Sequence, residues 1–174
     1  MNRITTTVVA TLTALATITP VAKAQSNYSH HMMLGDTVRS TGVNLKINPL
    51  RCWEKVAYGW YWARNNEMVI CQVNKNKVGV EERWTEEDLD TLRHEAQHLV
   101  QDCMDGKRQG ALDSVYKEPI ALAKSVLGTE RIGRILEEYS DASDHIKVME
   151  LEAFSVALMN KPLEQVEDIQ TYCF

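Results

Sequence analysis

The sequence lacks an excess of positive charge and a long hydrophobic run. It contains 19 Lys and Arg residues against 24 Asp and Glu residues, giving a formal charge of −5 at pH 7. Nucleic acids and anionic membranes attract basic surfaces, so this balance argues against both as partners. The apolar stretch at residues 8–18 is shorter than the roughly 20 residues that span a bilayer. The sequence shows no internal repeat or low-complexity tract, and the 150 residues that follow residue 24 suit one domain with one core.

The first 24 residues have the three parts of a secretory signal peptide. Arg3 supplies a positive start, residues 8–18 an apolar though threonine-rich middle, and Ala22-Lys23-Ala24 a small-x-small cleavage site. Cleavage after Ala24 would leave 150 residues with a formal charge of −7. We therefore expect a secreted or periplasmic protein with no stable membrane association. A retained membrane anchor is the alternative.

Residues 25–40 show no clear periodicity, and we predict a flexible leader ahead of a domain at 41–174. The leader contains the adjacent pair His30-His31. Neighbouring side chains do not converge as residues four apart on a helix do, which favours a solvated pair over a metal site. The leader is too short for a folded inhibitory prodomain.

No two of the four cysteines have Cys-x-x-Cys spacing, which argues against a cysteine metal site. All four lie after the predicted signal, and an exported chain meets an oxidising compartment, so we expect two disulfides. Three pairings exist. We favour Cys52 with Cys71 across a hairpin, and Cys103 with Cys173, which would tie the C-terminal tail to a helix near residue 103.

The segment at residues 91–100, Thr-Leu-Arg-His-Glu-Ala-Gln-His-Leu-Val, carries the H-E-x-x-H pattern. On a helix, His94 and His98 project from one face about 5–6 Å apart and can share a metal ion. Glu95 lies beside them, where a carboxylate can accept the proton of a water that zinc activates. The alternative is an ordinary amphipathic helix that happens to carry two histidines.

The flanking residues predict a single helix over 85–105. Thr85 with Asp88 resembles a capping box, and Gly106 is well placed to end the helix. An apolar stripe at spacings of three and four would bury the side opposite the histidines. Its members are Leu89, Leu92, Ala96, Leu99 and Cys103.

This helix resembles the active-site helix of the zincin metallopeptidases, including Thr91 and Leu92 upstream and Val100 after the second histidine. The metzincin subgroup has a third histidine six residues after the second one, where this chain has Met104. The resemblance is therefore to the gluzincins, which take a glutamate ligand from a later helix. It implies one zinc ion per chain, with an open position for water.

Three strands are expected before the helix, at residues 43–47, 58–62 and 68–73. Together they predict a small antiparallel sheet, so the fold class is α+β with a mainly helical remainder. In zincins an edge strand of such a sheet pairs with an extended substrate. The resemblance offers 68–73 as that edge, and an internal hairpin is the alternative.

Helices are predicted over 119–127 and 130–139, and a last strong helix from near Asp141 or Ser143 to Met159. The last helix contains Glu150 and Glu152, which point about 200° apart, so only one can face the metal. We choose Glu152 as the third ligand because Glu152-Ala153 resembles the gluzincin setting.

Four further residues are candidates for supporting roles. Tyr116 and Tyr139 could each donate to a developing oxyanion, with half-buried packing as the alternative. His145, two turns before Glu152, is a candidate catalytic residue over the cleft, with a surface histidine as the alternative. Asp102 could hydrogen-bond a ligand imidazole, or be an exposed acid.

The sequence predicts a secreted zinc metallopeptidase that hydrolyses a peptide or protein substrate. His94, His98 and Glu152 would hold zinc, and Glu95 would be the general base. The alternatives are a catalytically silent zincin-like domain that binds a partner, and a zinc-dependent hydrolase of a non-protein amide.

Overall fold

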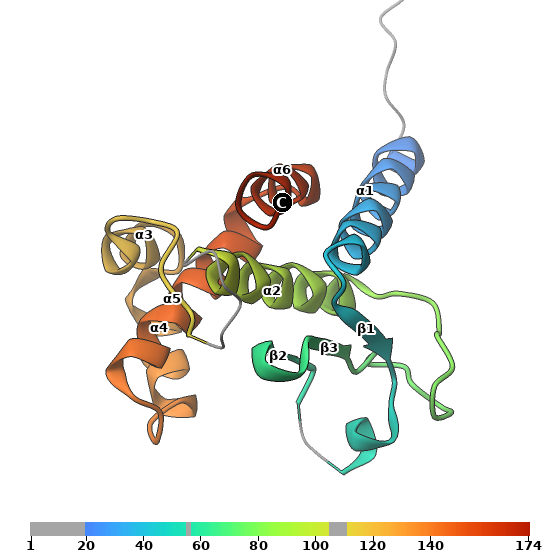
Figure 1. Ribbon diagram of the computed structural model, residues 1–174, viewed down its shortest axis with the longest axis horizontal. Helices are drawn as coiled ribbons and strands as arrows, with labels where there is room; N and C mark the ends of the chain where they lie inside the picture. The colour runs from blue at the N-terminus through green and yellow to red at the C-terminus, as the bar shows by residue number, and fades with distance from the viewer. Residues whose placement is uncertain (1–19, 55–56, 105–110) are drawn as a thin grey trace, which may run out of the picture.

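The computed structural model describes residues 20–54, 57–104 and 111–174, and has the expected α+β class. Within these residues a small three-stranded sheet accompanies six α-helices. The helix α2 lies at the centre of the molecule, with the sheet on one side and α1 and α6 on the other (Figure 1). The helices α3 and α4 lie together beyond one end of α2, where they contact α5.

The sheet is mixed, which corrects the prediction that it is antiparallel. Its strands are β1 (Asn44–Ile47), β2 (Gly59–Trp62) and β3 (Glu67–Ile70), in the order β1-β3-β2. β3 pairs antiparallel with β2 through a short connection, but parallel with β1. β3 is therefore the central strand, so the suggestion that residues 68–73 form the open edge is wrong. β2 is the edge strand that contacts α2.

The central helix α2 (Glu86–Cys103) matches its prediction closely. Thr85 caps it, and the Thr85 hydroxyl and the Asp88 carboxylate each accept a backbone N–H of the other residue, as in a capping box. The expected apolar stripe is buried in the core. The predicted stop at Gly106 lies outside the described residues.

The helix α1 (Pro20–Ser40) replaces the flexible leader that the sequence suggested for residues 25–40. It packs against α6 and α2, with Leu34 and Val38 fully buried in the main core. His31 is also buried, so the prediction that His30 and His31 form a solvated pair is wrong for His31. The helix also spans the proposed cleavage point after Ala24, while most of the predicted signal lies outside the described residues.

The C-terminal half is helical throughout. α3 (Pro119–Val126) and α4 (Gly128–Glu138) agree with their predictions to within two residues. α5 (Asp144–Met159) begins after its N-cap, Ser143, and ends at the predicted residue. The sequence analysis did not identify α6 (Pro162–Tyr172), in which Pro162 occupies the first turn, where its missing N–H costs nothing.

Both predicted disulfides are present. Cys52, in a short 3₁₀ helix (Leu50–Trp53), is bonded to Cys71 just after β3. Cys103 at the end of α2 is bonded to Cys173 at the end of α6. Disulfides of this kind are typical of proteins in an oxidising, extracellular environment. Across the described residues, no helix has the length and apolar character needed to cross a membrane.

Candidate metal centre

Helix α2 places His94 and His98 one turn apart, on the side that α5 covers. Their rings meet edge to face with centroids 4.7 Å apart, and their Nε2 atoms are separated by 3.1 Å. Both residues are buried. The two imidazoles therefore aim their Nε2 nitrogens at one enclosed point.

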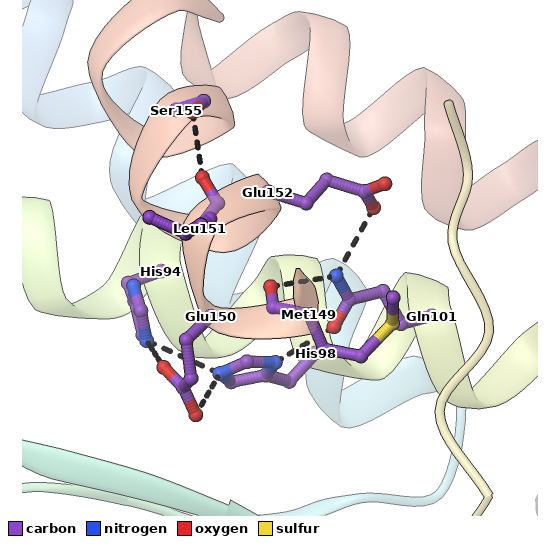
Figure 2. Close-up of polar contacts among 8 residues, drawn as sticks. All are labelled: His94, His98, Gln101, Met149, Glu150, Leu151, Glu152 and Ser155. Carbon is purple, nitrogen blue, oxygen red and sulfur yellow. Dashed lines mark hydrogen bonds and ion pairs between the residues drawn. The ribbon is translucent and has the colours of Figure 1, made fainter. Parts of the chain in front are cut away.

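Glu150 of α5 completes the group. Its Oε2 lies 3.2 Å from His94 Nε2, and its Oε1 lies 3.4 Å from His98 Nε2. Figure 2 shows the carboxylate reaching down from α5 to both rings. In the described part of the chain, these three residues form the one group of His, Cys, Asp or Glu side chains close enough to bind a metal ion.

The choice of Glu152 over Glu150 as the third ligand is corrected by this geometry. Glu152 is fully buried but points away from the histidines, toward Gln101 (Figure 2). The sequence argument that only one of the two glutamates faces the metal holds, because residues two apart leave a helix on nearly opposite sides. The small residue Ala153 next to Glu152 therefore did not indicate which of the two glutamates lies beside the histidines.

The three side chains fit a tetrahedral metal ion. Zinc lies about 2.0–2.2 Å from nitrogen and oxygen ligands, which places ligand atoms about 3.3–3.5 Å apart at tetrahedral angles. The two Nε2 atoms are 3.1 Å apart, close to that spacing, and each lies 3.2 or 3.4 Å from a different oxygen of the Glu150 carboxylate, so either oxygen is near the third ligand position. Two imidazoles and one carboxylate are also a donor set that zinc accepts in proteins.

The charges in the group favour a cation. Burial by itself would raise the pKa of Glu150, but hydrogen bonds and attraction from the two imidazoles hold it well below its usual range. Burial would lower the pKa of His98, yet the hydrogen bond and charge of Glu150 raise it to about 9. The negative carboxylate thus stabilises positive charge at this point, whether from a proton or from a metal ion that displaces it.

Glu95 lies beside this group, at the edge of a cavity of about 310 Å³. It is 5% exposed, and burial raises the pKa of its carboxyl, although the neighbouring histidines act in the opposite direction. A backbone hydrogen bond with Tyr61 of β2 holds the carboxylate. Strand β2 passes close here because Gly59 has no side chain: a Cβ at Gly59 would lie 3.2 Å from Glu95 Oε1.

The cavity runs from β2 across α2 to α4 and α5. His94 and Glu95 line it together with apolar, aromatic and charged side chains. The other lining residues are Ala57, Tyr58, Gly59, Asp90, Thr91, Arg131, Glu138, Tyr139, Phe154, Ala157 and Leu158. The ring of Phe154 contacts His94 with centroids 4.3 Å apart. A molecule in the cavity therefore lies against Glu95 and against His94 of the metal group.

Of the two candidate tyrosines, Tyr139 is at the site and Tyr116 is not. Tyr139 lines the cavity, and it is close enough to Glu150 for the charge of that carboxylate to act on its hydroxyl. Burial, followed by the charge of Glu150, raises the pKa of Tyr139 far above its usual value, so its hydroxyl stays a donor. The backbone N–H of Tyr116 instead donates to Glu152.

His145 does not lie over the cavity, which corrects its assignment as a catalytic residue. Its exposed ring is near the start of α5, with Nε2 2.7 Å from the carbonyl oxygen of Leu112. The alternative interpretation, a surface histidine, describes it. Seven residues complete two helical turns only approximately. In addition, α5 approaches the histidines of α2 near its middle, at Glu150, whereas His145 lies near its start.

The hydrogen bond to a candidate ligand imidazole, suggested for Asp102, is made by the neighbouring residue Gln101. Asp102 is fully buried rather than exposed, and accepts a hydrogen bond of 2.8 Å from the Tyr61 hydroxyl. Gln101 Oε1 lies 2.8 Å from His98 Nδ1 instead. The i, i+3 spacing of His98 and Gln101 was a signal for this contact that the sequence analysis missed.

Comparisons of the chain with protein-family models, with curated proteins and with solved structures gave no match. Any function must therefore be argued from the geometry of the group formed by His94, His98, Glu150 and Glu95.

Proposed function

We propose that this protein is a zinc-dependent metallopeptidase that acts outside the cytoplasm. The observation that carries the proposal is the convergence of His94, His98 and Glu150 at one buried point, with Glu95 beside them at the cavity. The two disulfides support an oxidising location. The H-E-x-x-H helix and the later glutamate are what the resemblance to gluzincins implies, with Glu150 in the place of Glu152.

The three residues would supply three ligands to zinc and leave a fourth position on the cavity side. When bound, zinc lowers the pKa of a coordinated water and polarises a carbonyl group. No other protein ligand is needed for this chemistry. A closed structural site would instead use four protein ligands, and the described residues place only three at this point.

Glu95 is the proposed general base. Burial raises the pKa of its carboxyl, so it accepts a proton more readily than a solvated glutamate does. In the proposed reaction Glu95 takes a proton from the attacking water and transfers it to the amine that leaves. The backbone of Tyr61 hydrogen-bonds this carboxylate.

Tyr139 is the proposed donor to the oxyanion that develops on the substrate carbonyl. It lines the same cavity and keeps its proton. The charge of Glu150 contributes to the raised pKa of Tyr139, so the hydroxyl lies near the metal group. A donor already placed near the developing charge needs little reorganisation in the transition state.

The proposed substrate is an extended peptide. β2 is an edge strand whose residue Gly59 lines the cavity, so a peptide backbone could pair with β2 and pass over Glu95. The apolar wall at Phe154, Ala157 and Leu158 would then receive an apolar side chain.

The test is hydrolysis of a peptide library by the purified, zinc-loaded protein, followed by mass spectrometry. We expect cleavage that stops after chelation and returns with zinc, and that is absent from Glu95→Gln. Zinc binding without cleavage would contradict the proposal and favour the silent binding domain. Cleavage of a cell-wall amide, but not of peptides, would favour the other alternative.

A further inference from the structure

Gln101 stands between the candidate ligand His98 and the buried carboxylate of Glu152. Its Oε1 lies 2.8 Å from His98 Nδ1, and its Nε2 donates to Glu152 Oε1 at 3.0 Å and to the carbonyl oxygen of Met149 at 3.1 Å. Figure 2 shows these contacts as a continuous chain from α5 to the His98 ring. Gln101 and Glu152 are both fully buried, so water does not compete for these bonds.

The surroundings fix which way the Gln101 amide points. A backbone carbonyl can only accept a hydrogen bond, so the side of the amide that faces Met149 must be the NH₂ group. Glu152 Oε1 also accepts from Gln97 and from the backbone N–H of Val115, which makes it an acceptor toward Gln101 as well. Turning the amide over would set an oxygen against two oxygens, which leaves Oε1 facing His98.

The direction of the amide determines where the His98 ring carries its proton. An amide oxygen can only accept, so Nδ1 of His98 must be the donor in the 2.8 Å contact. In a neutral imidazole the other nitrogen then has a lone pair. That nitrogen is Nε2, which points to His94 Nε2 and Glu150.

We propose that Gln101 is a positioning residue that holds His98 in the form with the proton on Nδ1, and that Glu152 and Met149 hold Gln101 in turn. Whenever the ring is neutral, the chain leaves the lone pair on Nε2, the nitrogen that faces the metal position. This inference rests on the metal site of the proposed function, but not on peptide hydrolysis. It also gives Glu152 a role different from the ligand role that the sequence suggested.

Gln97 provides a matched control on the same helix. It is as buried as Gln101 and donates to the same oxygen, Glu152 Oε1, at 3.1 Å. Its own amide oxygen has no hydrogen-bond partner among the described residues, and it makes no hydrogen bond to a histidine there. Gln97→Leu thus removes a buried glutamine and a bond to Glu152, and leaves the contact with His98 intact.

The first measurement uses the unmodified, metal-free protein at alkaline pH, where the imidazole is neutral. Long-range ¹H–¹⁵N NMR correlations of His98 distinguish the two ring nitrogens. We expect the proton on Nδ1, and a ring protonated mainly on Nε2 would overturn the proposal whether or not the protein is a peptidase.

The second measurement compares zinc affinities of Gln101→Leu and Gln97→Leu by competition with a chromophoric chelator. We expect Gln101→Leu to bind zinc about 10–100-fold more weakly, as is typical when a partner of a metal-binding histidine is lost. Gln97→Leu should stay within about threefold of the unmodified protein. Equal losses in the two variants, or no loss in Gln101→Leu, would overturn the proposal. Should Gln101→Leu fail to fold, the NMR measurement on the unmodified protein decides alone.

Discussion

Glu150 and Glu152 leave α5 in opposite directions and meet different partners. Glu150 lies 3.2 and 3.4 Å from the Nε2 atoms of the two histidines, whereas Glu152 accepts hydrogen bonds from Gln97 and Gln101 on its side of the helix. The two residues are therefore a natural pair for separating loss of a ligand from loss of a buried hydrogen-bond acceptor.

Glu150→Gln should bind zinc more than about 100-fold more weakly, because losing a ligand costs more than losing a neighbour of a ligand. The free energy of unfolding of the zinc-free protein should fall by less than the zinc-binding free energy does, since glutamine keeps the size and shape of the glutamate side chain. Equilibrium dialysis with metal analysis measures the first quantity. Stoichiometric zinc with unchanged affinity in Glu150→Gln would show that the ligand is another residue.

Glu152→Gln should show the opposite pattern. It keeps the metal group but replaces a carboxylate that accepts several buried bonds, including the backbone N–H groups of Val115 and Tyr116. Leaving buried donors unpaired costs about 1–3 kcal/mol of unfolding free energy. Denaturant unfolding of the zinc-free protein measures this, and zinc should still bind in stoichiometric amount. Loss of zinc equal to that of Glu150→Gln would argue against the difference in their roles.

Glu95→Gln should keep zinc and lose hydrolysis. The amide has the same shape but accepts no proton, and general-base catalysis typically contributes about 10²–10⁴-fold in rate. Metal content and kcat measured on the same preparation separate the two effects. Unchanged kcat with zinc bound would exclude Glu95 as the base.

Gly59→Ala should reduce both stability and activity. An added Cβ would lie 2.6 Å from Thr91 Cγ2 and 2.8 Å from the backbone oxygen of Val69, so β2 must shift away from α2. Overpacking of this kind costs about 1–3 kcal/mol of unfolding free energy. The shift of β2 would also move Tyr61, whose backbone is hydrogen-bonded to Glu95. Thermal unfolding and kcat/KM measure the two effects.

Gly133→Ala is the control for that substitution. Gly133 is an exposed residue within α4, and a Cβ there would meet nothing within 4 Å. Alanine in a helix interior is favoured over glycine by about 0.5–1 kcal/mol, so this variant should be slightly more stable with unchanged activity. If Gly133→Ala lost as much stability and activity as Gly59→Ala, close packing at Gly59 would not explain the loss in Gly59→Ala.

The Cys103–Cys173 disulfide should contribute more stability than Cys52–Cys71. The bonded residues are 70 positions apart in the first and 19 in the second. In the chain-entropy model these loops correspond to about 4 and about 3 kcal/mol of unfolding free energy. Denaturant unfolding of the two double Cys→Ala variants compares them. A greater loss for the shorter loop would mean that native contacts, rather than loop length, set the order.

Features of local sequence were predictable, and those that depend on distant packing were not. Thr85 and Asp88 predict the start of α2. The spacing of His94 and His98 predicts that both rings lie on one face of that helix. Which glutamate faces those rings depends on the rotation of α5 against α2, and neighbouring small residues do not determine that rotation. The sequence narrowed the choice to Glu150 or Glu152 and then selected the wrong one.

The errors at the N-terminus and in the sheet have a similar origin. The buried face of α1 includes His31 as well as Leu34 and Val38. Because a polar residue occupies a buried position, the apolar residues do not show the regular spacing that predicts a helix. β2 pairs with one side of β3, and β1 pairs in parallel with the other side. Strand patterns indicate which segments are extended, but not the order in which they pair.

The central claim is that one metal ion binds between His94, His98 and Glu150. Crystals of the zinc-loaded protein, with diffraction data collected on both sides of the zinc absorption edge, test it most directly. The account predicts one anomalous peak about 2.0–2.2 Å from His94 Nε2, His98 Nε2 and a carboxylate oxygen of Glu150. A fully loaded crystal with no peak there, or with its peak at Glu152, would contradict it.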